Sequence, residues 1–506
     1  MKSIFLIATI LWLFNYKLFF TIFSSLDGFY EPFYEILVYF VISLFLSSIF
    51  SFNRVLNAIF INLLLMVSII AIYFINTMGI EIEGDMLNNA LSTNASETLE
   101  LLNLYFYIYI FVALIGLYLI NKKILVTQKS LPMKHYFILM LTLFLLVFGL
   151  FKLNREALDE FIKHDTPKIV PTFIFPAISD YIIMLDRKVK IDKKSISREF
   201  KLKEDFNDTI VIFVLGESAR GDRFELNGYP KSTTPELLKQ KNIVSFKNVT
   251  SCDTSTLNSI PCLMMRVKHS AYNQEIKESS FVEIFKDLGY QTYWFSRNSN
   301  QKRVDTFCQE SQDCQYLYDL EYDNDLLVNL KSVINKDGNI FVLLHTMGSH
   351  INYNIRVPKR YRKFLPLCES GVSNCTKEEL DNSYDNSIYY TNIFLSKIID
   401  TLSNKNAILI YTSDHGESLG EDSYGLMKHF GHSTPYRVAP KEQTDVPFIL
   451  WFSDKYLENH KSLNLEKMRK LENISHDNIF YSTLGCADIS SQEDKNINKL
   501  NVCNPE

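Results

Sequence analysis

The sequence predicts a chain of two parts: an α-helical membrane domain with five transmembrane helices, followed by an exported α/β domain. Three observations support this prediction. Long apolar runs fill the first 153 residues, although the mean hydropathy of the whole 506-residue chain is near zero. All eight cysteines lie after position 250. From residue 209 onward, short apolar segments alternate with helix-length segments, which is typical of a mainly parallel sheet covered by helices.

Five apolar runs reach the roughly 20 residues that a helix needs to cross a bilayer. They lie at about 3–24, 33–50, 55–76, 104–120 and 136–153. Basic residues flank one side of these runs (Lys2, Arg54, Lys122, Lys123, Lys129 and Lys134) and acidic residues the other (Asp27, Glu31, Glu81, Glu83, Asp85, Glu97 and Glu100). The positive-inside bias therefore predicts a membrane protein with a cytoplasmic N-terminus and an exported chain after Leu153. A cleaved signal peptide is the alternative for the first run, which contains Lys17 and lacks a convincing cleavage site.

The cysteines agree with export to an oxidising compartment. The first six form three close pairs, which we predict to be the disulfides Cys252–Cys262, Cys308–Cys314 and Cys368–Cys375. Zinc-binding thiolates are the alternative, but no C-x-x-C motif occurs. Cys486 and Cys503 form a fourth bridge or stay free, and the sequence leaves that choice open.

Between the two parts, residues 154–205 are rich in charge and contain three prolines. Apolar residues recur at roughly helical spacing from Phe173 to Leu185, which predicts amphipathic helices at the membrane surface. An ordinary solvated linker is the alternative, above all for 188–203. The predicted domains are therefore a transmembrane domain at 1–153, bridging helices and linker at 154–205, and an exported α/β domain at 206–506.

Strands are predicted at about 209–215, 291–296, 339–345, 407–412 and 446–451. Glu217 follows the first of them, and Asp414 and His415 follow the fourth. The carboxyl ends of parallel strands gather at one edge of a sheet, so these side chains are expected to converge. Carboxylates and an imidazole suit a divalent metal, most of all zinc. Asp-His-Gly alone could be a helix-capping turn, but the second acid at another strand end favours a metal site.

A hydroxyl-rich run, Ser251–Thr256, precedes a short helical segment. A threonine at a helix N-terminus lies in a positive field, and a neighbouring zinc ion would lower its hydroxyl pKa further, so Thr256 is a candidate nucleophile. Together, Glu217, Thr256, Asp414 and His415 would complete a tetrahedral ligand set. Thr254 and Ser255 are chemically similar neighbours, and chemistry alone does not choose among the three hydroxyls.

Four motifs resemble those of the bacterial lipid A phosphoethanolamine transferases. They are G-E-S-A-R-G-D-R from Gly216, S-C-D-T-S-T-L-N-S-I-P-C from Ser251, H-T-M-G-S-H from His345 and S-D-H-G-E-S-L-G-E from Ser413. The resemblance spans nearly the whole chain, including the five membrane helices, and implies a bacterial inner-membrane protein whose catalytic domain, residues 206–506, is periplasmic. It implies an alkaline-phosphatase/sulfatase-like α/β fold and transfer of phosphoethanolamine from phosphatidylethanolamine to lipid A or another envelope acceptor. It also implies one tightly bound zinc ion, with a second during catalysis left open.

Residue by residue, the resemblance implies zinc ligation by Glu217, Asp414 and His415 and selects Thr256 as the nucleophile. Asn298 and Lys302 match the family's substrate-side asparagine and lysine, although a solvated surface lysine is the alternative for Lys302. His350 matches a position that contacts substrate or a second zinc ion. The family has one further histidine, where this chain has two in K-H-F-G-H-S-T-P-Y: His432 is favoured by counting back from Pro435, and His429 is the alternative.

In the membrane part, Asn89, Thr93 and Glu97 repeat at a spacing of four, which would place them on one face of a helix. The family shows the same spacing, which suggests that this loop holds the lipid head group; the wet face of an interfacial helix is the alternative. The chain also departs from the family pattern. Ile351-Asn352 replaces Gly-Pro, and Gln301 replaces a cysteine, so the acceptor stays open.

The expected partners are the phosphatidylethanolamine donor, lipid A or another envelope glycoconjugate as acceptor, and membrane lipids, with the chain acting as a monomer. Nucleic acid is not expected, because the net charge is −5 and no basic face stands out. A glycerol-phosphate transferase on the same scaffold is the alternative function. A sulfatase lacks support because its C-x-P-x-R or S-x-P-x-R motif is missing, and intact ligands argue against a non-catalytic scaffold.

Overall fold

The computed structural model describes residues 2–16, 19, 30–79, 104–125, 129–153, 169–175, 177–179, 181–182, 193–203, 208–298, 301–423 and 427–504. It has two compact units: a helical unit in the chain up to Met184 and an α/β unit in the chain from Leu185 onward. This division falls within the segment for which the sequence predicts bridging helices and a linker.

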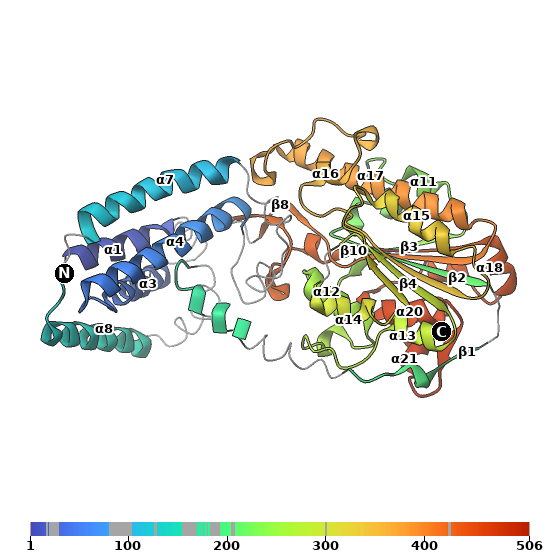
Figure 1. Ribbon diagram of the computed structural model, residues 1–506, viewed down its shortest axis with the longest axis horizontal. Coiled ribbons are helices and arrows are strands. Elements are labelled where there is room, and N and C mark those ends of the chain that lie inside the picture. Colours follow the sequence, from blue (N-terminus) through green and yellow to red (C-terminus); the bar gives the residue numbers. More distant parts are fainter. Residues whose placement is uncertain are drawn as a thin grey trace. The chain divides into compact units, whose positions relative to one another are not determined.

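Five apolar helices occupy the predicted membrane runs: α1 (Lys2–Leu13), α3 (Tyr30–Ser48), α4 (Arg54–Met78), α7 (Leu104–Ile120) and α8 (Met133–Leu153) (Figure 1). Among the residues that the structure describes, three spans, 54–78, 104–123 and 133–150, are long and apolar enough to cross a membrane. Within the described residues, α1 and the 33–48 part of α3 are shorter apolar helices. The first predicted run, 3–24, continues beyond α1 into residues that lie mostly outside the described part of the chain.

Short polar contacts join the helices of this unit. The side chain of Asn15 donates to the Val170 carbonyl at 2.8 Å and accepts from the Val170 N–H at 2.9 Å, and it also donates to the Tyr39 hydroxyl of α3. Asn62 of α4 and Asn121 exchange two amide hydrogen bonds of 2.8 and 2.7 Å. In an apolar environment such pairs hold helices together, because each amide satisfies the other.

A seven-stranded sheet forms the centre of the α/β unit, with the strand order β3-β10-β7-β2-β6-β4-β5. The four pairings within β7-β2-β6-β4-β5 are parallel, whereas β10 runs antiparallel to both β3 and β7. The strands are β2 (Thr209–Gly216), β3 (Ile243–Thr250), β4 (Gln291–Ser296), β5 (Asp313–Tyr316), β6 (Ile340–His345), β7 (Asn406–Ser413) and β10 (Asp445–Phe452). All five predicted strands are present, and the predicted mainly parallel sheet is confirmed.

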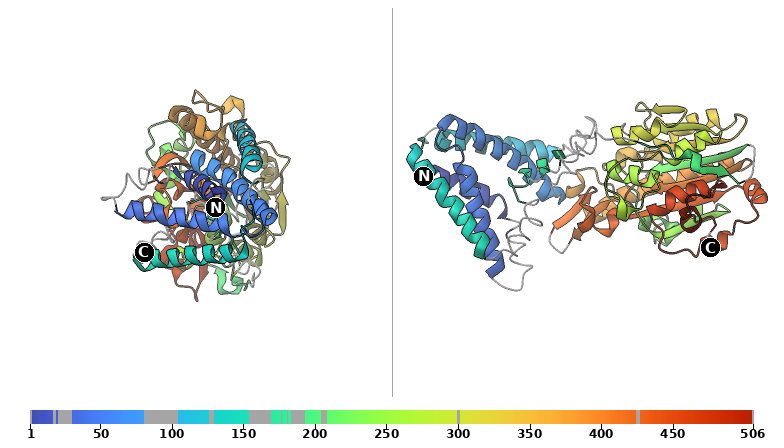
Figure 2. Two further views of the ribbon diagram at one scale, coloured as in Figure 1. Left: turned by 90° about the vertical axis from the view of Figure 1, so that its left-hand side faces the viewer. Right: turned by 90° about the horizontal axis from the view of Figure 1, so that it is seen from below.

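Helices cover both faces of this sheet (Figures 1 and 2). One face carries α11 (Pro235–Leu238), α15 (Leu326–Val333) and α17 (Lys377–Leu402), and the other α12 (Thr256–Met264), α13 (Phe281–Asp287), α14 (Lys302–Cys308) and α20 (Ile479–Gly485). Every residue of β2, β6 and β7 is therefore buried, which explains their nearly continuous apolar sequence. On β2, Phe213 packs against Phe281 of α13, with 5.2 Å between ring centroids.

Smaller elements complete the unit. Two further pairs of strands form two-stranded sheets: β1 (Phe200–Leu202) with β11 (Ile489–Ser491), and β8 (Ser418–Ser423) with β9 (Met427–Gly431). The short helices are α16 (Tyr353–Arg356), α18 (Asp454–Asn459), α19 (Leu465–Met468) and α21 (Asn496–Leu500).

All eight cysteines are paired. The three predicted disulfides are present, and a fourth joins Cys486 to Cys503, which the sequence left open. The Cys252–Cys262 bridge ties the loop after β3 to α12. The two cysteines of each bridge are at most 17 positions apart in the sequence, so each bridge restrains a local segment.

Peptide mapping of the unreduced chain is expected to recover all four linked pairs, because no free cysteine remains. Alkylation before reduction should then label no native cysteine. A free thiol at Cys486 or Cys503 would contradict the fourth bridge. Free thiols among the first six cysteines would contradict the prediction of export as well.

Candidate functional site

The register of two central strands brings the first two candidate ligands together. β2 pairs in parallel with β7, and the last residue of β2, Gly216, lies opposite the last residue of β7, Ser413. Glu217 and Asp414 therefore leave the sheet side by side at its carboxyl edge. Both side chains are completely buried, which is unusual for acids unless they have a partner.

A close backbone contact holds Glu217 in place. The Ser349 N–H donates to the Glu217 carbonyl at 2.9 Å. Gly348 has a left-handed φ of +46°, and a Cβ at this position would lie 2.6 Å from the Glu217 carbonyl oxygen. Only glycine fits both the backbone conformation and the space. The H-T-M-G-S-H motif therefore positions the Glu217 backbone.

The four candidate ligands from three elements meet in one cluster. Thr256 Oγ1, at the start of α12, lies 3.1 Å from Glu217 Oε2 and 3.2 Å from His415 Nε2. His415 Nε2 lies 3.4 Å from Glu217 Oε1 and 3.3 Å from Asp414 Oδ2. The structure thus brings together the four side chains that the sequence analysis grouped.

These distances fit a four-coordinate metal ion. Ligand atoms about 2.0–2.1 Å from a tetrahedral zinc ion lie about 3.3–3.4 Å from one another. Moreover, among the described residues, the buried Asp414 Oδ2 has no hydrogen-bond partner. An acid oxygen without a donor is costly inside a protein, and a cation would remove that cost. The donor set and its spacing therefore suit zinc.

Electrostatics lead to the same conclusion. Burial raises the pKa of Asp414 to about 6, and burial together with the charge of Asp414 raises the pKa of Glu217 to about 7. Two acids packed this closely resist joint ionisation unless a positive charge lies between them. A divalent cation would supply that charge and restore both carboxylates.

His415 has the tautomer that a metal ligand requires. Its Nδ1 lies 2.8 Å from the Gly416 carbonyl oxygen, and since a carbonyl only accepts, Nδ1 carries the hydrogen. The lone pair is then on Nε2, which faces Thr256 and Glu217. Burial, reinforced by nearby His432, lowers the pKa of His415 to about 3, so the ring is neutral.

The hydroxyl groups of Thr254 and Ser255, the two alternative nucleophiles, form hydrogen bonds outside the cluster. Thr254 Oγ1 donates to the Thr434 carbonyl at 2.6 Å, and Ser255 Oγ donates to Asp253 Oδ1 at 3.2 Å. Asp253 also accepts from the backbone N–H groups of both residues. Of the three neighbouring hydroxyls, the one that contacts the acid cluster is therefore that of Thr256.

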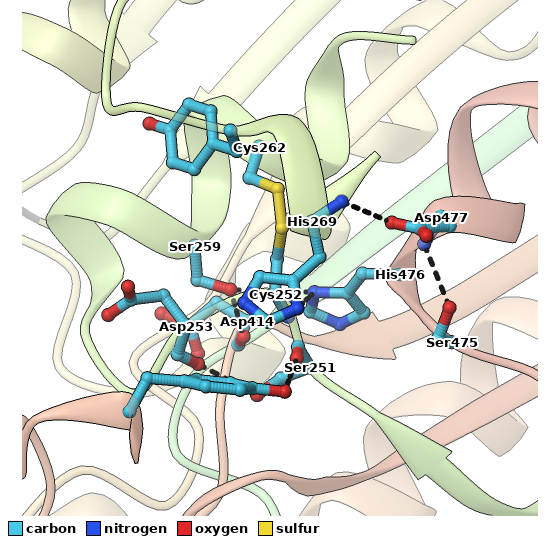
Figure 3. Close-up of a disulfide and its surroundings, with 12 residues drawn as sticks. Ser251, Cys252, Asp253, Ser259, Cys262, His269, Asp414, Ser475, His476 and Asp477 are labelled. Carbon is cyan, nitrogen blue, oxygen red and sulfur yellow. Dashed lines mark hydrogen bonds between the residues drawn. A yellow bond between two sulfur atoms is a disulfide. The ribbon is translucent and has the colours of Figure 1, made fainter. Parts of the chain in front are cut away.

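A buried histidine that the sequence analysis did not single out links the two sides of the cluster. His476 Nδ1 accepts from the Cys252 N–H at 3.0 Å, and its Nε2 lies 3.0 Å from the Ser413 carbonyl. Ser259 of α12 donates in turn to the Asp414 carbonyl. Figure 3 shows His476 and Ser259 beside the Cys252–Cys262 disulfide. This network ties the segment that carries Thr256 to the strand end that carries Asp414.

A second group of side chains borders the cluster. The His432 ring lies 4.3 Å from that of His415 and 5.5 Å from that of His350, centroid to centroid. Its Nδ1 bonds Glu417 Oε2 at 2.8 Å, and the other oxygen of Glu417 accepts from the Tyr353 hydroxyl at 2.9 Å. Glu417 is not among the residues predicted for the site, although it lies in the S-D-H-G-E-S-L-G-E motif. Burial opposes protonation of His432, but Glu417 outweighs it and raises the pKa of His432 to about 9.

Glu217, His415 and His432 form an alternative metal-binding group, because their potential ligand atoms all lie within 4.8 Å of one another. This group is wider than the cluster with Thr256 and Asp414, whose neighbouring atoms lie 3.1–3.4 Å apart. The shorter spacing matches a single four-coordinate ion better. His432 therefore lies beside the tighter cluster, on the side where His350 is also found.

The remaining candidate residues differ in their surroundings. Asn298 is buried and donates to Glu217 Oε2 at 2.8 Å, so it contacts a candidate ligand directly. Lys302 is exposed at the first position of α14. The histidine that lies against His415 is His432, whereas His429 is buried on β9. Asn89, Thr93 and Glu97 lie outside the described residues.

Comparisons with known proteins agree with this architecture. Residues 209–489 match the family model for sulfatases, and residues 39–183 match the model for the phosphoethanolamine transferases EptA/EptB. The chain is 32% identical over 435 residues to the phosphoethanolamine transferase EptA of Helicobacter pylori, covering 82% of this chain and 79% of the relative. It is 33% identical over 319 residues to the Kdo(2)-lipid A phosphoethanolamine 7''-transferase of Escherichia coli K12, covering 60% and 55%.

The similarity extends to a solved membrane protein. The integral membrane lipooligosaccharide phosphoethanolamine transferase A (EptA) of Neisseria meningitidis matches with a TM-score of 0.86 and 27% identity, covering 100% of this chain and 99% of that protein. This match includes both the helical unit and the sulfatase-like unit, which confirms the expected fold class. The chain therefore belongs to the bacterial phosphoethanolamine transferase family.

Proposed function

We propose that this chain is an inner-membrane enzyme that transfers phosphoethanolamine from phosphatidylethanolamine to lipid A or another envelope acceptor. The observation that carries the proposal is the convergence of Glu217, Thr256, Asp414 and His415 in one cluster, in which each side chain lies 3.1–3.4 Å from at least one of the others. Its relatives, a phosphoethanolamine transferase and a Kdo(2)-lipid A phosphoethanolamine 7''-transferase, support this reaction class. We assign residues 1–153 to the membrane domain, 154–205 to the bridging segment and 206–506 to the periplasmic catalytic domain, with a cytoplasmic N-terminus.

The four clustered side chains would hold one zinc ion. When bound, zinc would lower the pKa of the Thr256 hydroxyl and offset charge that develops on the phosphoryl oxygens. Asn298 supports Glu217 through its 2.8 Å hydrogen bond. The Nδ1–H of His415 is held by Gly416, so that the ring cannot turn its Nε2 away from the cluster.

The reaction proceeds in two displacements at phosphorus. In the first, Thr256 Oγ1, whose proton is directed at Glu217 Oε2, attacks the donor phosphorus; a P–O bond to threonine forms and the bond to the glycerol oxygen breaks. Diacylglycerol leaves after its oxygen takes a proton. In the second, an oxygen of the acceptor attacks the same phosphorus and releases Thr256. Phosphoethanolamine-threonine is therefore a covalent intermediate.

Residues beside the cluster would bind the phosphoryl group and move protons. His432 and His350 border the cluster on one side, with their rings 5.5 Å apart. His432, whose pKa is raised by Glu417, can protonate the leaving oxygen. Burial lowers the pKa of His350, so its neutral ring can bind a phosphoryl oxygen. Glu417 orients His432 through its 2.8 Å bond to Nδ1, which leaves Nε2 for the substrate. Lys302 is exposed and free to reach a phosphate oxygen.

Thr256→Ala is expected to lower transfer by about a thousandfold or more, because the attacking oxygen is removed. Intact-mass analysis after incubation with phosphatidylethanolamine should find the covalent adduct in the wild-type chain and not in the variant. Thr254→Ala and Ser255→Ala are matched controls that should keep the adduct. An adduct that persists in Thr256→Ala but disappears in either control would move the nucleophile to that neighbour.

Glu217→Gln and Asp414→Asn are expected to lose both bound zinc and transfer, because each removes a negatively charged ligand while keeping the side-chain shape. Elemental analysis of the dialysed chain measures the metal. Glu310→Gln is the matched control, since Glu310 is also buried but bonds Lys193 and Ser280 outside the cluster. A Glu217 or Asp414 variant that keeps one zinc ion per chain would remove that residue from the ligand set.

Gly348→Ala should weaken zinc binding by about ten- to a hundredfold without removing a ligand, because the new methyl group would displace the Glu217 backbone. Gly338→Ala is the control: Gly338 also has a positive φ of +88°, but its added Cβ would come no closer than 3.9 Å to a neighbour. Zinc affinity measured by competition with a chelator distinguishes the two. Equal affinities in both variants would show that the close contact does not position Glu217.

A further inference from the structure

One stretch of the α/β unit has a charge opposite to that of the chain. Residues 338–368 contain five basic residues and no Asp or Glu, although the whole chain has a net charge of −5. The basic residues are Arg356, Lys359, Arg360, Arg362 and Lys363. The net charge of the whole chain does not reveal this local excess of basic residues, and no basic face was therefore expected from the sequence. Its middle part, residues 355–365, is called the basic loop below.

Three cations of the basic loop face solvent. Lys359, Arg360 and Lys363 are exposed. The guanidinium of Arg360 lies over the Tyr361 ring at 5.0 Å, and Lys363 Nζ donates to the Ser232 carbonyl at 2.8 Å. Across the described part of the α/β unit, no carboxylate forms an ion pair with any of the three. Their charges are therefore available to an anionic partner.

Large apolar side chains lie at both ends of the same loop. Leu365 is 66% exposed and Ile355 is 52% exposed. Exposed leucine and isoleucine next to unpaired cations form the pattern of an interfacial segment, in which apolar groups enter the head-group region and cations bind phosphates. A soluble polyanion would use the cations but would leave the apolar side chains in water.

The basic loop is held in shape before any partner binds. Arg362 donates to the Val357 and Asn354 carbonyls at 3.1 and 2.7 Å. The backbone N–H groups of Lys363 and Phe364 both donate to Asn386 Oδ1 of α17. A preformed loop loses little conformational entropy on binding.

The loop is also directly connected to the proposed active site. Arg356, at the end of α16, approaches His350 Nδ1 at 3.4 Å, and Tyr353, at the start of α16, bonds Glu417. His350 in turn lies beside His432. The segment that leads into the basic loop is therefore joined by direct contacts to side chains that border the cluster.

We propose that the basic loop is a membrane-contact surface that binds an anionic phospholipid bilayer. Leu365 and Ile355 enter the head-group region, and Lys359, Arg360 and Lys363 bind lipid phosphates. A bilayer fits because the same chain carries membrane-spanning helices, which keep this surface at high local lipid concentration. The consequence for catalysis rests on the proposed function: the contact presents the site to a donor that is itself a bilayer lipid.

Quenching of a fluorophore by lipids tests the contact in the full-length chain. Since all eight native cysteines are paired, Leu365→Cys introduces a single free thiol for a polarity-sensitive fluorophore. The labelled chain is placed in nanodiscs of phosphatidylglycerol and phosphatidylcholine that contain a spin-labelled lipid. Val328→Cys is the matched control, because Val328 is 74% exposed on α15 of the same unit. Strong quenching is expected at position 365 and weak quenching at 328; equal quenching at both would overturn the proposal.

A charge variant tests the cations. Each cation is expected to raise the equilibrium constant for contact with an anionic surface by about fivefold. The double variant Lys359→Gln with Arg360→Gln should therefore lower that constant by about 25-fold. Lys461→Gln with Lys470→Gln removes two exposed cations elsewhere and should change nothing. Nanodiscs of phosphatidylcholine alone should lower the quenching of the wild-type label as well. Quenching at position 365 that stays the same in the double variant and in uncharged nanodiscs would overturn the role of the cations.

A donor comparison separates this inference from the proposed function. The ratio of turnover with bilayer phosphatidylethanolamine to turnover with a short-chain, water-soluble phosphatidylethanolamine should fall in the Lys359/Arg360 variant. An unchanged ratio would overturn the catalytic consequence. If neither donor is used by the wild-type chain, the proposed function fails, while the quenching at position 365 still decides whether the basic loop contacts the bilayer.

Discussion

The parallel pairing of β2 with β7 is the constraint on which the site depends. Because Gly216 lies opposite Ser413, two acids that are far apart in the sequence emerge from the sheet as neighbours. Helices on both faces make these central strands fully buried, and Glu217 and Asp414, which follow their carboxyl ends, are buried as well. The fold thus sets up an electrostatic problem that a divalent cation solves.

The residues around the two acids hold the candidate ligands in position. Gly348 lets a second backbone approach Glu217, and Gly416 fixes the tautomer of His415 through its carbonyl. On the other side, His476 and the Cys252–Cys262 bridge fasten the start of α12, so that Thr256 faces the acids while its neighbouring hydroxyls do not. Positioning of this kind allows one threonine, among three adjacent hydroxyls, to serve as a nucleophile.

The sequence predicted the parts that depend on local patterns or on distinctive motifs. The buried strands were recognisable because both of their faces are apolar, whereas the missed β3 and β5 are edge strands: β3 exposes polar residues such as Lys247, and β5 spans only four residues. The four clustered ligands lie in recognisable sequence motifs. His476 lies in none, because it acts through backbone contacts with distant segments. The role of Glu417 depends on its contacts with His432 and Tyr353, which only the folded chain brings together. The basic loop was missed because its positive charge is not visible in the net charge of the whole chain.

The most direct test of the account is the zinc-edge X-ray absorption spectrum of the purified full-length chain. The account predicts four nitrogen and oxygen ligands at about 2.0 Å, with the scattering of one imidazole from His415 and none from sulfur, because every cysteine is bridged. A spectrum with sulfur ligands, or one that requires an octahedral shell of light atoms, would contradict a site made by Glu217, Thr256, Asp414 and His415.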